Sequence, residues 1–138
     1  MLKQISFVSV VVADLEAAIK TYQNLFNLEV MVSTRISRVG NYRFAVLGSN
    51  GQPLFEIMEP TDPQGAVARL MQERANSQNP RGEGLYMVGV QVDDLGQTVK
   101  QIEAAGGRVN TDEAMPNVAW VHPLSTHYAF IELVQQRQ

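Results

Sequence analysis

Hydrophobic and polar positions alternate near the start of the chain, and the same alternation returns at an offset of 80 residues. Residues 7–20 read FVSVVVADLEAAIK, and residues 87–100 read MVGVQVDDLGQTVK. Each stretch places valine at every second position before an Asp-Leu pair, which is typical of a half-buried strand. In the first stretch, apolar residues then recur at helical spacing. The repetition predicts two copies of one unit that opens with a strand and a helix.

A second match joins the ends of the two copies. Residues 54–58 (LFEIM) align with residues 130–134 (FIELV) at an offset of 76, so Glu56 meets Glu132. Apolar runs of strand-like composition fill the chain between each helix and these matches. The strands expected after the helices cover 29–33, 42–47 and 54–59 in the first copy and 108–110, 118–122 and 128–134 in the second. Each copy therefore reads as one strand, one helix and three further strands.

Turn and cap residues support these boundaries. Asp14 and Asp94 stand where an N-cap is expected, and Asp94 with Gln97 resembles a capping box. Asn50-Gly51 favours a tight hairpin turn between the last two strands of the first copy. Gly106-Gly107 is expected to end the second helix.

The segment between the copies predicts a short helix and a loop. Thr61-Asp62-Pro63 offers an N-cap and a first-turn proline, and an apolar face follows at Val67, Leu70 and Met71. Residues 76–84 are polar and contain glycine and proline, as expected of a loop. We therefore expect one α+β domain over residues 1–138, with a first module at 1–60, a linker helix within 61–82 and a second module at 83–138. The paired βαβββ modules would form one curved, cup-like mixed sheet.

Side-chain alternation assigns faces to the first strands. If Val8, Val10 and Val12 pack on the helix, their neighbours Phe7, Ser9 and Val11 point to the other, concave face, as do Met87, Gly89 and Gln91 in the second copy. Glu56 and Glu132 stand on strands that are otherwise apolar. Burying an isolated carboxylate costs several kcal/mol, so this pair is the main chemical anomaly of the sequence.

Composition excludes several classes of function. The chain has 138 residues, 45% hydrophobic and 18% charged positions, a net charge of −3 and no cysteine. Disulfide scaffolds, thiolate zinc sites and cysteine nucleophiles are therefore excluded. The basic residues are scattered, so no nucleic-acid partner is expected. No membrane span or secretory leader is recognisable, so we expect a cytoplasmic protein without a membrane partner. The low charged fraction favours a homodimer, which would hide apolar surface.

Four stretches in order resemble the vicinal oxygen chelate superfamily, whose paired βαβββ modules occur in glyoxalase I, extradiol dioxygenases, and fosfomycin and bleomycin resistance proteins. They are VVADLEAAIKTYQNLFNLEV, FEIMEP, GEGLYMVGVQVDDL and HPLSTHYAFIELVQ. They are most similar to methylmalonyl-CoA epimerases. The resemblance implies a metal-binding cup in which each module gives one ligand from its first strand and one from its last.

The ligand positions implied by the resemblance fall on Phe7, Glu56, Met87 and Glu132. The family has histidine at the first and third of these positions. Phenylalanine cannot coordinate a metal, and the thioether of methionine suits copper(I) better than hard divalent ions. We therefore expect no cofactor and no metal of the family type. The resemblance also leaves Arg43 in a region where an additional catalytic carboxylate would be sought.

Glu56 and Glu132 are the predicted catalytic residues. One ionised and one protonated carboxyl group could remove a proton α to a thioester carbonyl and return it on the other face. Alternatively, both are relics of a lost metal site, with hydrogen bonds from Ser9, Gln91, Tyr128 or water. The surrounding side chains either line an apolar ligand pocket or simply fill a closed core. The predicted substrate-binding residues are Phe7, Met58, Met87, Gln91, Trp120, His122, Ser125, Thr126, Tyr128 and Phe130.

Some of these assignments rest on the resemblance or on side-chain chemistry alone. The stretch HPLST resembles the loop that lies near the bound thioester in the epimerases, which implicates His122, Ser125 and Thr126. His127 would replace a lost metal ligand if it pointed into the cup. The polar atoms of Tyr86, Trp120 and Tyr128 could stabilise an enolate oxygen or satisfy their own hydrogen bonds. Arg35, Arg38 and Arg43 are assigned no role.

Three functions stay open. The first is a metal-independent isomerase or epimerase that acts next to a carbonyl group. The second is a homodimeric module that binds or sequesters an apolar small molecule without chemistry, as in the bleomycin resistance proteins. The third is a metal-dependent lyase or epimerase whose altered ligand set contains Glu56, Glu132, His127 and water.

Overall fold

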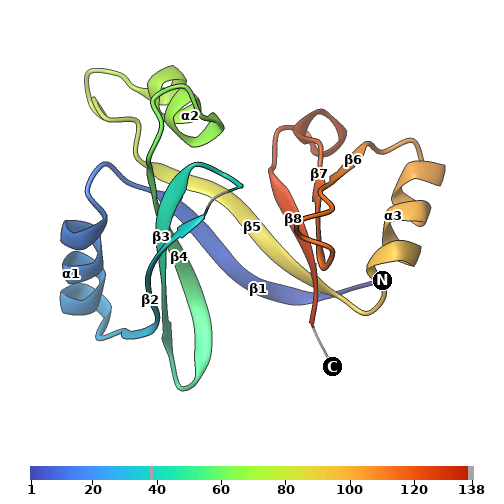
Figure 1. The fold of residues 1–138 in the computed structure, drawn as a ribbon, viewed down its shortest axis with the longest axis horizontal. Helices are drawn as coiled ribbons and strands as arrows, with labels where there is room; N and C mark the ends of the chain where they lie inside the picture. Colours follow the sequence, from blue (N-terminus) through green and yellow to red (C-terminus); the bar gives the residue numbers. More distant parts are fainter. Residues whose placement is uncertain (38, 137–138) are drawn as a thin grey trace. The chain divides into compact units, whose positions relative to one another are not determined.

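The computed structural model describes residues 1–37 and 39–136. It contains each predicted copy as a βαβββ module (Figure 1). The first module consists of β1 (Leu2–Val11), α1 (Leu15–Phe26), β2 (Glu29–Ser37), β3 (Tyr42–Ser49) and β4 (Gln52–Pro60). The second consists of β5 (Gly84–Val92), α3 (Leu95–Ala104), β6 (Val109–Thr111), β7 (Val118–Val121) and β8 (Ile131–Gln135), and the helix α2 (Ala66–Arg74) lies between the modules in sequence. The α+β prediction is confirmed: the strands form one mixed sheet in the order β2-β3-β4-β1-β5-β8-β7-β6.

The chain separates into two compact units, which do not coincide with the two copies of the repeat. Ser9–Tyr86 forms one, here called the α1 unit, and Met1–Val8 joins the chain from Met87 onward in the other, the α3 unit. Both β1 and β5 are thereby divided between the units. In the α3 unit, Lys3 forms an ion pair with Asp93 at 3.2 Å, which links the start of β1 to the end of β5.

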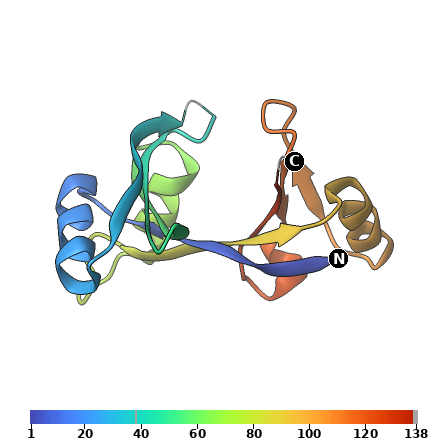
Figure 2. The ribbon, with the colours of Figure 1, turned by 90° about the horizontal axis from the view of Figure 1, so that it is seen from below.

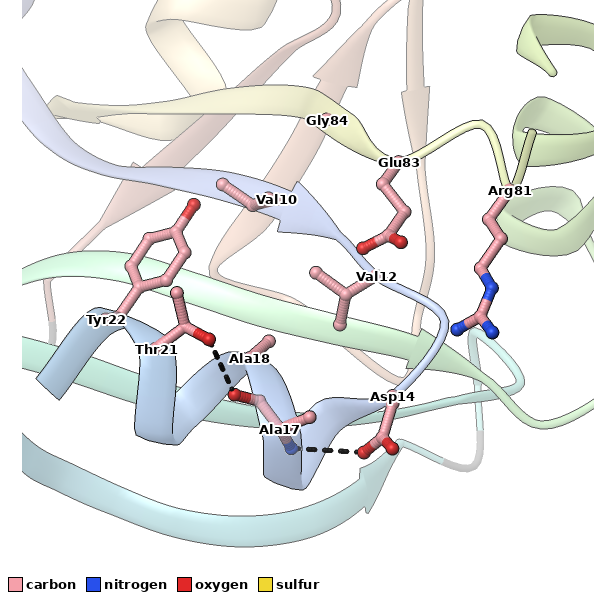
Figure 3. Close-up of a pocket in the computed structure, with 10 residues that line it drawn as sticks. All are labelled: Val10, Val12, Asp14, Ala17, Ala18, Thr21, Tyr22, Arg81, Glu83 and Gly84. Atoms are coloured by element: carbon pink, nitrogen blue, oxygen red, sulfur yellow. Dashed lines mark hydrogen bonds between the residues drawn. The ribbon is translucent and has the colours of Figure 1, made fainter. Parts of the chain in front are cut away.

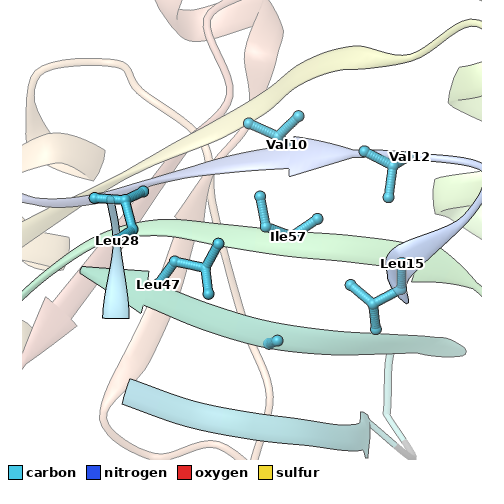
Figure 4. Close-up of a cluster of buried hydrophobic side chains, with 7 residues drawn as sticks. Val10, Val12, Leu15, Leu28, Leu47 and Ile57 are labelled. Atoms are coloured by element: carbon cyan, nitrogen blue, oxygen red, sulfur yellow. The ribbon is translucent and has the colours of Figure 1, made fainter. Parts of the chain in front are cut away.

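The α1 unit has a hydrophobic cluster on each face of its strands. Val10 and Val12 pack with Leu15, Leu47 and Ile57 on the face that α1 covers, as Figure 4 shows. The remaining members of this buried cluster are Leu28 and Ala45. The predicted burial against the helix is confirmed for Val10 and Val12, whereas Val8 is half-buried and does not belong to this cluster.

On the opposite face of the α1 unit, Val11 packs with Met58 of β4 and with Val67 and Met71 of α2. The apolar face predicted for the linker helix is therefore correct. The predicted start of this helix at Thr61-Asp62-Pro63 is wrong, because α2 begins at Ala66. The carboxylate of Asp62 instead accepts a hydrogen bond from the backbone N–H of Gln64 at 2.9 Å, which makes a local turn before the helix.

In the α3 unit, α3 lies beside the strands (Figure 2). One hydrophobic cluster is buried between this helix and the strands. Its members are Val92, Leu95, Ala119, Val121 and Leu133. β8 pairs in parallel with β5 and antiparallel with β7, so Glu132 lies opposite Gly89 on one side and Trp120 on the other.

The last strand starts later than the sequence predicts. β8 begins at Ile131, whereas a strand was expected from Tyr128. His127 and Tyr128 have left-handed backbones, with φ of 54° and 67°, and Tyr128 donates its N–H to the carbonyl of Pro123. Two consecutive positive φ angles are incompatible with an extended strand. They end the short 3₁₀ helix Pro123–Thr126 instead.

None of the helices in the described ranges is long and apolar enough to cross a membrane.

Candidate functional site

Glu56 lies in the middle of β4, in the α1 unit. Its neighbour Ile57 belongs to the cluster under α1, so the carboxyl group of Glu56 points to the other face, together with Met58. There Ser9 Oγ donates a hydrogen bond to Glu56 Oε1 at 3.0 Å. Ser9 is completely buried. The sequence predicted Ser9 as one possible partner of the carboxylates, and the structure confirms this contact.

The surroundings of Glu56 favour its protonated form. Burial raises the pKa of the Glu56 carboxyl group above its usual value of 4.5, and the hydrogen bond from Ser9 opposes this only in part. The ion pairs found in residues 1–37 and 39–136 join Lys3 to Asp93 and Arg43 to Glu16 and Glu59, so none of them stabilises the Glu56 carboxylate. A carboxyl group with a raised pKa can both donate and accept a proton nearer neutral pH.

Glu132 lies at the corresponding place on β8, in the α3 unit. Its side chain is 7% exposed. The indole Nε1–H of Trp120 donates a hydrogen bond to Glu132 Oε2 at 3.3 Å. Leu133, the next residue, packs in the cluster under α3, so Glu132 points to the opposite face of the strand. The indole thus acts as a hydrogen-bond donor to this buried carboxyl group.

Phe7 and Gly89 lie next to each other in the same unit. A Cβ atom added to Gly89 would lie only 2.6 Å from Phe7 Cζ, so the ring of Phe7 occupies the space that a side chain at position 89 would need. Gly89 is also the strand partner of Glu132. The aromatic ring therefore stands on the strand segment that carries one of the two predicted catalytic residues.

Two further predicted site residues of the α3 unit are buried. Met87 is 6% exposed and Gln91 is 8% exposed. The Gln91 amide oxygen accepts a hydrogen bond from Gln4 Nε2 at 3.0 Å, so it is engaged by β1 and not by a glutamate in this contact. In the α1 unit, Met58 is buried inside a cluster and contributes to the core. Whether any of these side chains touches a ligand stays a prediction.

The HPLST stretch lies mainly on another face. Ser125 and Thr126 line an apolar cavity of about 310 Å³ together with Ile102 of α3, Val121 and Leu133. Ile102, Val121 and Leu133 belong to the cluster under α3, whereas Glu132 points to the opposite face of β8. Within the α3 unit, Ser125 and Thr126 are thus not brought to the face of Glu132.

The histidines and aromatic residues around this stretch are placed by local structure. Nδ1 of His122 accepts a hydrogen bond from the backbone N–H of Leu124 at 3.2 Å, so His122 caps the 3₁₀ helix. His127 ends that helix and is exposed, and Tyr128 is 80% exposed. Phe130 precedes β8 and is half-buried, and its carbonyl accepts the N–H of Val88 at 3.0 Å.

The residues at the implied ligand positions do not fit the family's metal. Positions 7 and 87 carry a phenyl ring and a buried thioether, neither of which suits a hard divalent ion. In the part of the chain that the structure describes, no three His, Asp, Glu or Cys side chains are grouped so that they could hold a metal ion. Of the two ring nitrogens of His122, Nδ1 is engaged in the cap of the 3₁₀ helix.

Of the three arginines to which the sequence assigned no role, the structure describes Arg35 and Arg43. Arg43 forms ion pairs with Glu16 and with Glu59, the latter at 2.8 Å. Glu59 also accepts the N–H of Leu15 at 3.4 Å, so these charges join β3 and β4 to the start of α1. Arg35 is exposed on β2, and Arg38 lies outside the described residues.

A cavity that the sequence did not reveal lies beside α1 (Figure 3). It has a volume of about 420 Å³, and residues of β1, of α1, of the turn between them and of the stretch 81–84 that leads into β5 line it. Three of its side chains are charged, namely Asp14, Arg81 and Glu83. Sequence periodicity could assign Val10 and Val12 to the α1 face, but it could not bring residues 81–84 beside them.

A family model and a known relative both match most of this chain. The family model of the Glyoxalase/Bleomycin resistance protein/Dioxygenase superfamily matches residues 7–120. A probable lactoylglutathione lyase of Vibrio parahaemolyticus is 30% identical over 135 residues, which cover 92% of this chain and 86% of the relative.

Two solved structures have the same fold. The methylmalonyl-CoA epimerase of Mycobacterium tuberculosis superposes with a TM-score of 0.84 at 22% identity, covering 99% of this chain and 90% of that one. A variant of the Streptomyces coelicolor methylmalonyl-CoA epimerase in complex with 2-nitronate-propionyl-CoA gives a TM-score of 0.83 at 24% identity and covers both chains completely. The similarity predicted from the four sequence stretches is confirmed.

Proposed function

Because the chain belongs to the Glyoxalase/Bleomycin resistance protein/Dioxygenase superfamily, we propose that it is an isomerase or epimerase that moves a proton next to a carbonyl group without a metal. The observation that carries this proposal is the state of Glu56. Its carboxyl group is hydrogen-bonded to Ser9, and desolvation raises its pKa. Groups whose pKa is shifted toward the working pH are the ones that act as general acids and bases.

The proposed reaction needs only proton transfer. The Glu56 carboxylate takes the proton from the carbon α to the carbonyl, and the electron pair of that C–H bond forms an enolate. When the resulting carboxylic acid returns a proton to the same face of the α carbon, the carbonyl and the carboxylate are regenerated and the hydrogen is only exchanged. Inversion of the α carbon needs a second proton donor on the opposite face of the enolate. Ser9 Oγ–H would hold the Glu56 carboxylate in position through the cycle. Glu132 is the second proton donor and acceptor that the sequence predicts.

The names of the relatives support one substrate class. Their names refer to methylmalonyl-CoA and lactoylglutathione, which are both acyl thioesters. A thioester carbonyl makes the neighbouring C–H bond acidic enough for a carboxylate base in a preorganised site. We therefore propose an acyl thioester, or another apolar carbonyl compound with an α hydrogen, as the substrate.

Exchange of the α hydrogen provides the test. The protein, freed of metals by a chelator and checked by elemental analysis, is incubated with methylmalonyl-CoA in deuterated water, and mass spectrometry follows deuterium uptake. The metal-free protein is expected to catalyse exchange. Glu56→Gln should slow it by roughly 10²- to 10⁴-fold, because the amide cannot accept the proton.

Control variants separate chemistry from folding. Glu103→Gln changes an exposed glutamate of α3 and should leave exchange unchanged. Glu132→Gln tests the second predicted catalytic residue in the same assay. Full exchange by Glu56→Gln protein would refute the role of Glu56, and exchange that returns only with added metal would favour the metal-dependent alternative.

Binding without chemistry is the second candidate function. Both glutamates already accept a hydrogen bond from the protein, the half-buried Glu56 from Ser9 and the buried Glu132 from Trp120. Such contacts are also what a binding protein would need to tolerate carboxyl groups in an apolar setting. A thioester or apolar ligand that raises the melting temperature while no exchange occurs would favour this function.

A further inference from the structure

The cavity beside α1 is separate from the face that carries Glu56. Val10 and Val12 line it, and both belong to the cluster that packs under α1. Glu56 points to the opposite face of the α1 unit, where Val11 and Met58 are buried. A ligand in this cavity would therefore not touch the proposed catalytic carboxyl group.

One side of the cavity is apolar and aromatic. Val10, Val12 and Ala18 form an apolar surface, and Tyr22 closes one end. The ring of Tyr22 is fixed by edge contacts to Phe55 and Phe26, with ring centroids 5.2 and 5.8 Å apart. It is therefore a preorganised aromatic wall and not a side chain that must be ordered when a ligand binds.

The loop before β5 places two charged side chains on the other side. The side-chain amide of Asn79 donates to the carbonyl of Glu83 at 2.8 Å, and its oxygen accepts the N–H of Glu83 at 3.1 Å. Gly82, with φ of 64°, lies so close to the carbonyl of Met71 that a Cβ atom would overlap it. These contacts hold Arg81 and Glu83 at the cavity by their backbone.

The three charged side chains that line the cavity differ in their contacts. Asp14 Oδ1 caps α1 by accepting the N–H of Ala17 at 3.1 Å. Figure 3 shows the guanidinium of Arg81 on the side of Asp14 and the carboxylate of Glu83 directed into the cavity above Val12. Within the described ranges, the ion pairs of the protein involve neither Arg81 nor Glu83. The Glu83 carboxylate thus stands beside an apolar wall without an ion-pair partner among those residues.

We propose that this cavity binds an organic ammonium ion with an apolar or aromatic body. Two carboxylates face one guanidinium, so the lining favours a cation over an anion. An ammonium group can pair with Glu83 and approach the face of Tyr22, while the body of the ligand covers the valines. A volume of about 420 Å³ has room for a phenylalkyl amine.

The electrostatic surroundings of Tyr22 include the Glu83 carboxylate. Burial is the main reason that the pKa of the Tyr22 hydroxyl lies above its usual value of 10.0, and the negative charge of Glu83 raises it further. Both residues line the cavity, so one ligand can contact the Tyr22 ring and pair with the Glu83 carboxylate.

Binding of 2-phenylethylammonium to the full chain, measured by calorimetry near pH 7, tests the proposal. Saturable binding is expected. Glu83→Gln should weaken it about tenfold or more, because it removes the charge but keeps the shape of the side chain. The single variant Tyr22→Leu should also bind the amine more weakly, because the aromatic face is lost. Tyr22→Phe, which keeps the ring, should bind it within about threefold of the unchanged protein.

Matched controls exclude simpler explanations. Glu73→Gln alters an exposed glutamate on α2 and should leave the affinity unchanged. The neutral analogue 2-phenylethanol and the anion phenylacetate should bind at least about tenfold more weakly than the amine. Equal binding by the Glu83→Gln protein, or tighter binding of phenylacetate, would overturn the proposal. Glu56→Gln should not change amine affinity, so this site and the proposed proton transfer can fail independently.

Discussion

Glu56 shows how one residue can combine a cost to folding with a chemical capacity. Its side chain is half-buried, and a single neutral hydroxyl, that of Ser9, donates a hydrogen bond to its carboxyl group. Neutral hydrogen bonds compensate desolvation of a charge only in part, which is why its pKa is raised. The Glu56 carboxyl group should therefore affect the pH dependence of the free energy of unfolding as well as the activity.

Glu56→Gln should change the pH dependence of stability. Below the unfolded-state pKa, near 4.5, the carboxyl group is protonated in both states, and the variant should differ little. As the pH rises from there through the raised folded-state pKa, the native protein binds more protons than the unfolded chain, so its stability falls. The advantage of the glutamine variant should thus grow through this window and then level off.

Urea unfolding between about pH 4 and about pH 8 measures this difference. The matched variant Glu103→Gln, at an exposed position, should show no such trend. A constant difference between the Glu56→Gln protein and the unchanged protein over the whole range would contradict the raised pKa.

The contact between Phe7 and Gly89 also leads to a prediction for single residues. Gly89→Ala should lower the free energy of unfolding by about 1 to 3 kcal/mol, because the new methyl group would overlap the ring of Phe7. In a Phe7→Ala background the same change should cost much less, since the ring is absent. A double-mutant cycle by urea unfolding gives the coupling between the two positions, and additive effects would contradict the contact.

Among the elements, the two module helices begin in the same way. Asp14 Oδ1 accepts the N–H of Ala17 at 3.1 Å, and Asp94 Oδ1 accepts the N–H of Gln97 at 3.0 Å. The duplicated Asp-Leu pair therefore carries the same cap in both copies. The Asn50-Gly51 turn is equally local, with φ of 54° and 74° as a two-residue hairpin requires.

Removing either cap should have a similar cost. Asp14→Ala and Asp94→Ala are each expected to lower the free energy of unfolding by about 1 kcal/mol, because each leaves a backbone N–H without its side-chain acceptor. Glu103→Ala, within α3 and exposed, is the control and should cost less. Chemical denaturation measures all three, and a loss no larger than that of the control would show that the caps do not contribute.

Among the local features, the helix caps and the hairpin turn were predictable from the sequence, and the conformations at Asp62 and Tyr128 were not. The caps and the hairpin turn depend on two to four consecutive residues, and the sequence places them correctly. Asp62 forms a turn in place of the expected helix cap, and Tyr128 has a left-handed backbone although its apolar surroundings suggest a strand. Both backbone conformations are stabilised by hydrogen bonds that residue types alone do not predict.

For the candidate site, the sequence identified the residues but not their partners. Alternation placed Glu56 and Glu132 among apolar neighbours, and the structure adds the hydroxyl and the indole that bind them. The cavity beside α1 was missed because it depends on the packing of residues 81–84 near β1 and α1. Such packing between segments about 60 residues apart has no periodic signal in the chain.

For the whole molecule, the compact units cut across the sequence repeat. Met1–Val8 belongs to the first copy in sequence but lies in the α3 unit, where Gln4 and Lys3 contact Gln91 and Asp93. The cooperativity of unfolding should follow these units and not the boundaries of the repeat, because local stability follows buried contacts.

Amide hydrogen exchange can test this division. Leu133→Ala removes a side chain that is 1% exposed in the core of the α3 unit, and it is expected to cost about 2 to 5 kcal/mol. Exchange should then accelerate at residues 2–8 and 131–135 together, and much less at residues 10–12 and 42–49. Equal acceleration across all these segments, or protection of residues 2–8 in step with 42–49, would contradict the division.

The ring of Phe7 against Gly89 also has an evolutionary consequence. A bulky residue at position 7 and a side chain at position 89 exclude each other sterically, so the two positions are not free to drift independently. Among related sequences, those with an aromatic residue at position 7 should keep glycine at position 89, and larger residues at 89 should occur only where position 7 is small. The covariation of these two positions across the family would thus record this steric exclusion.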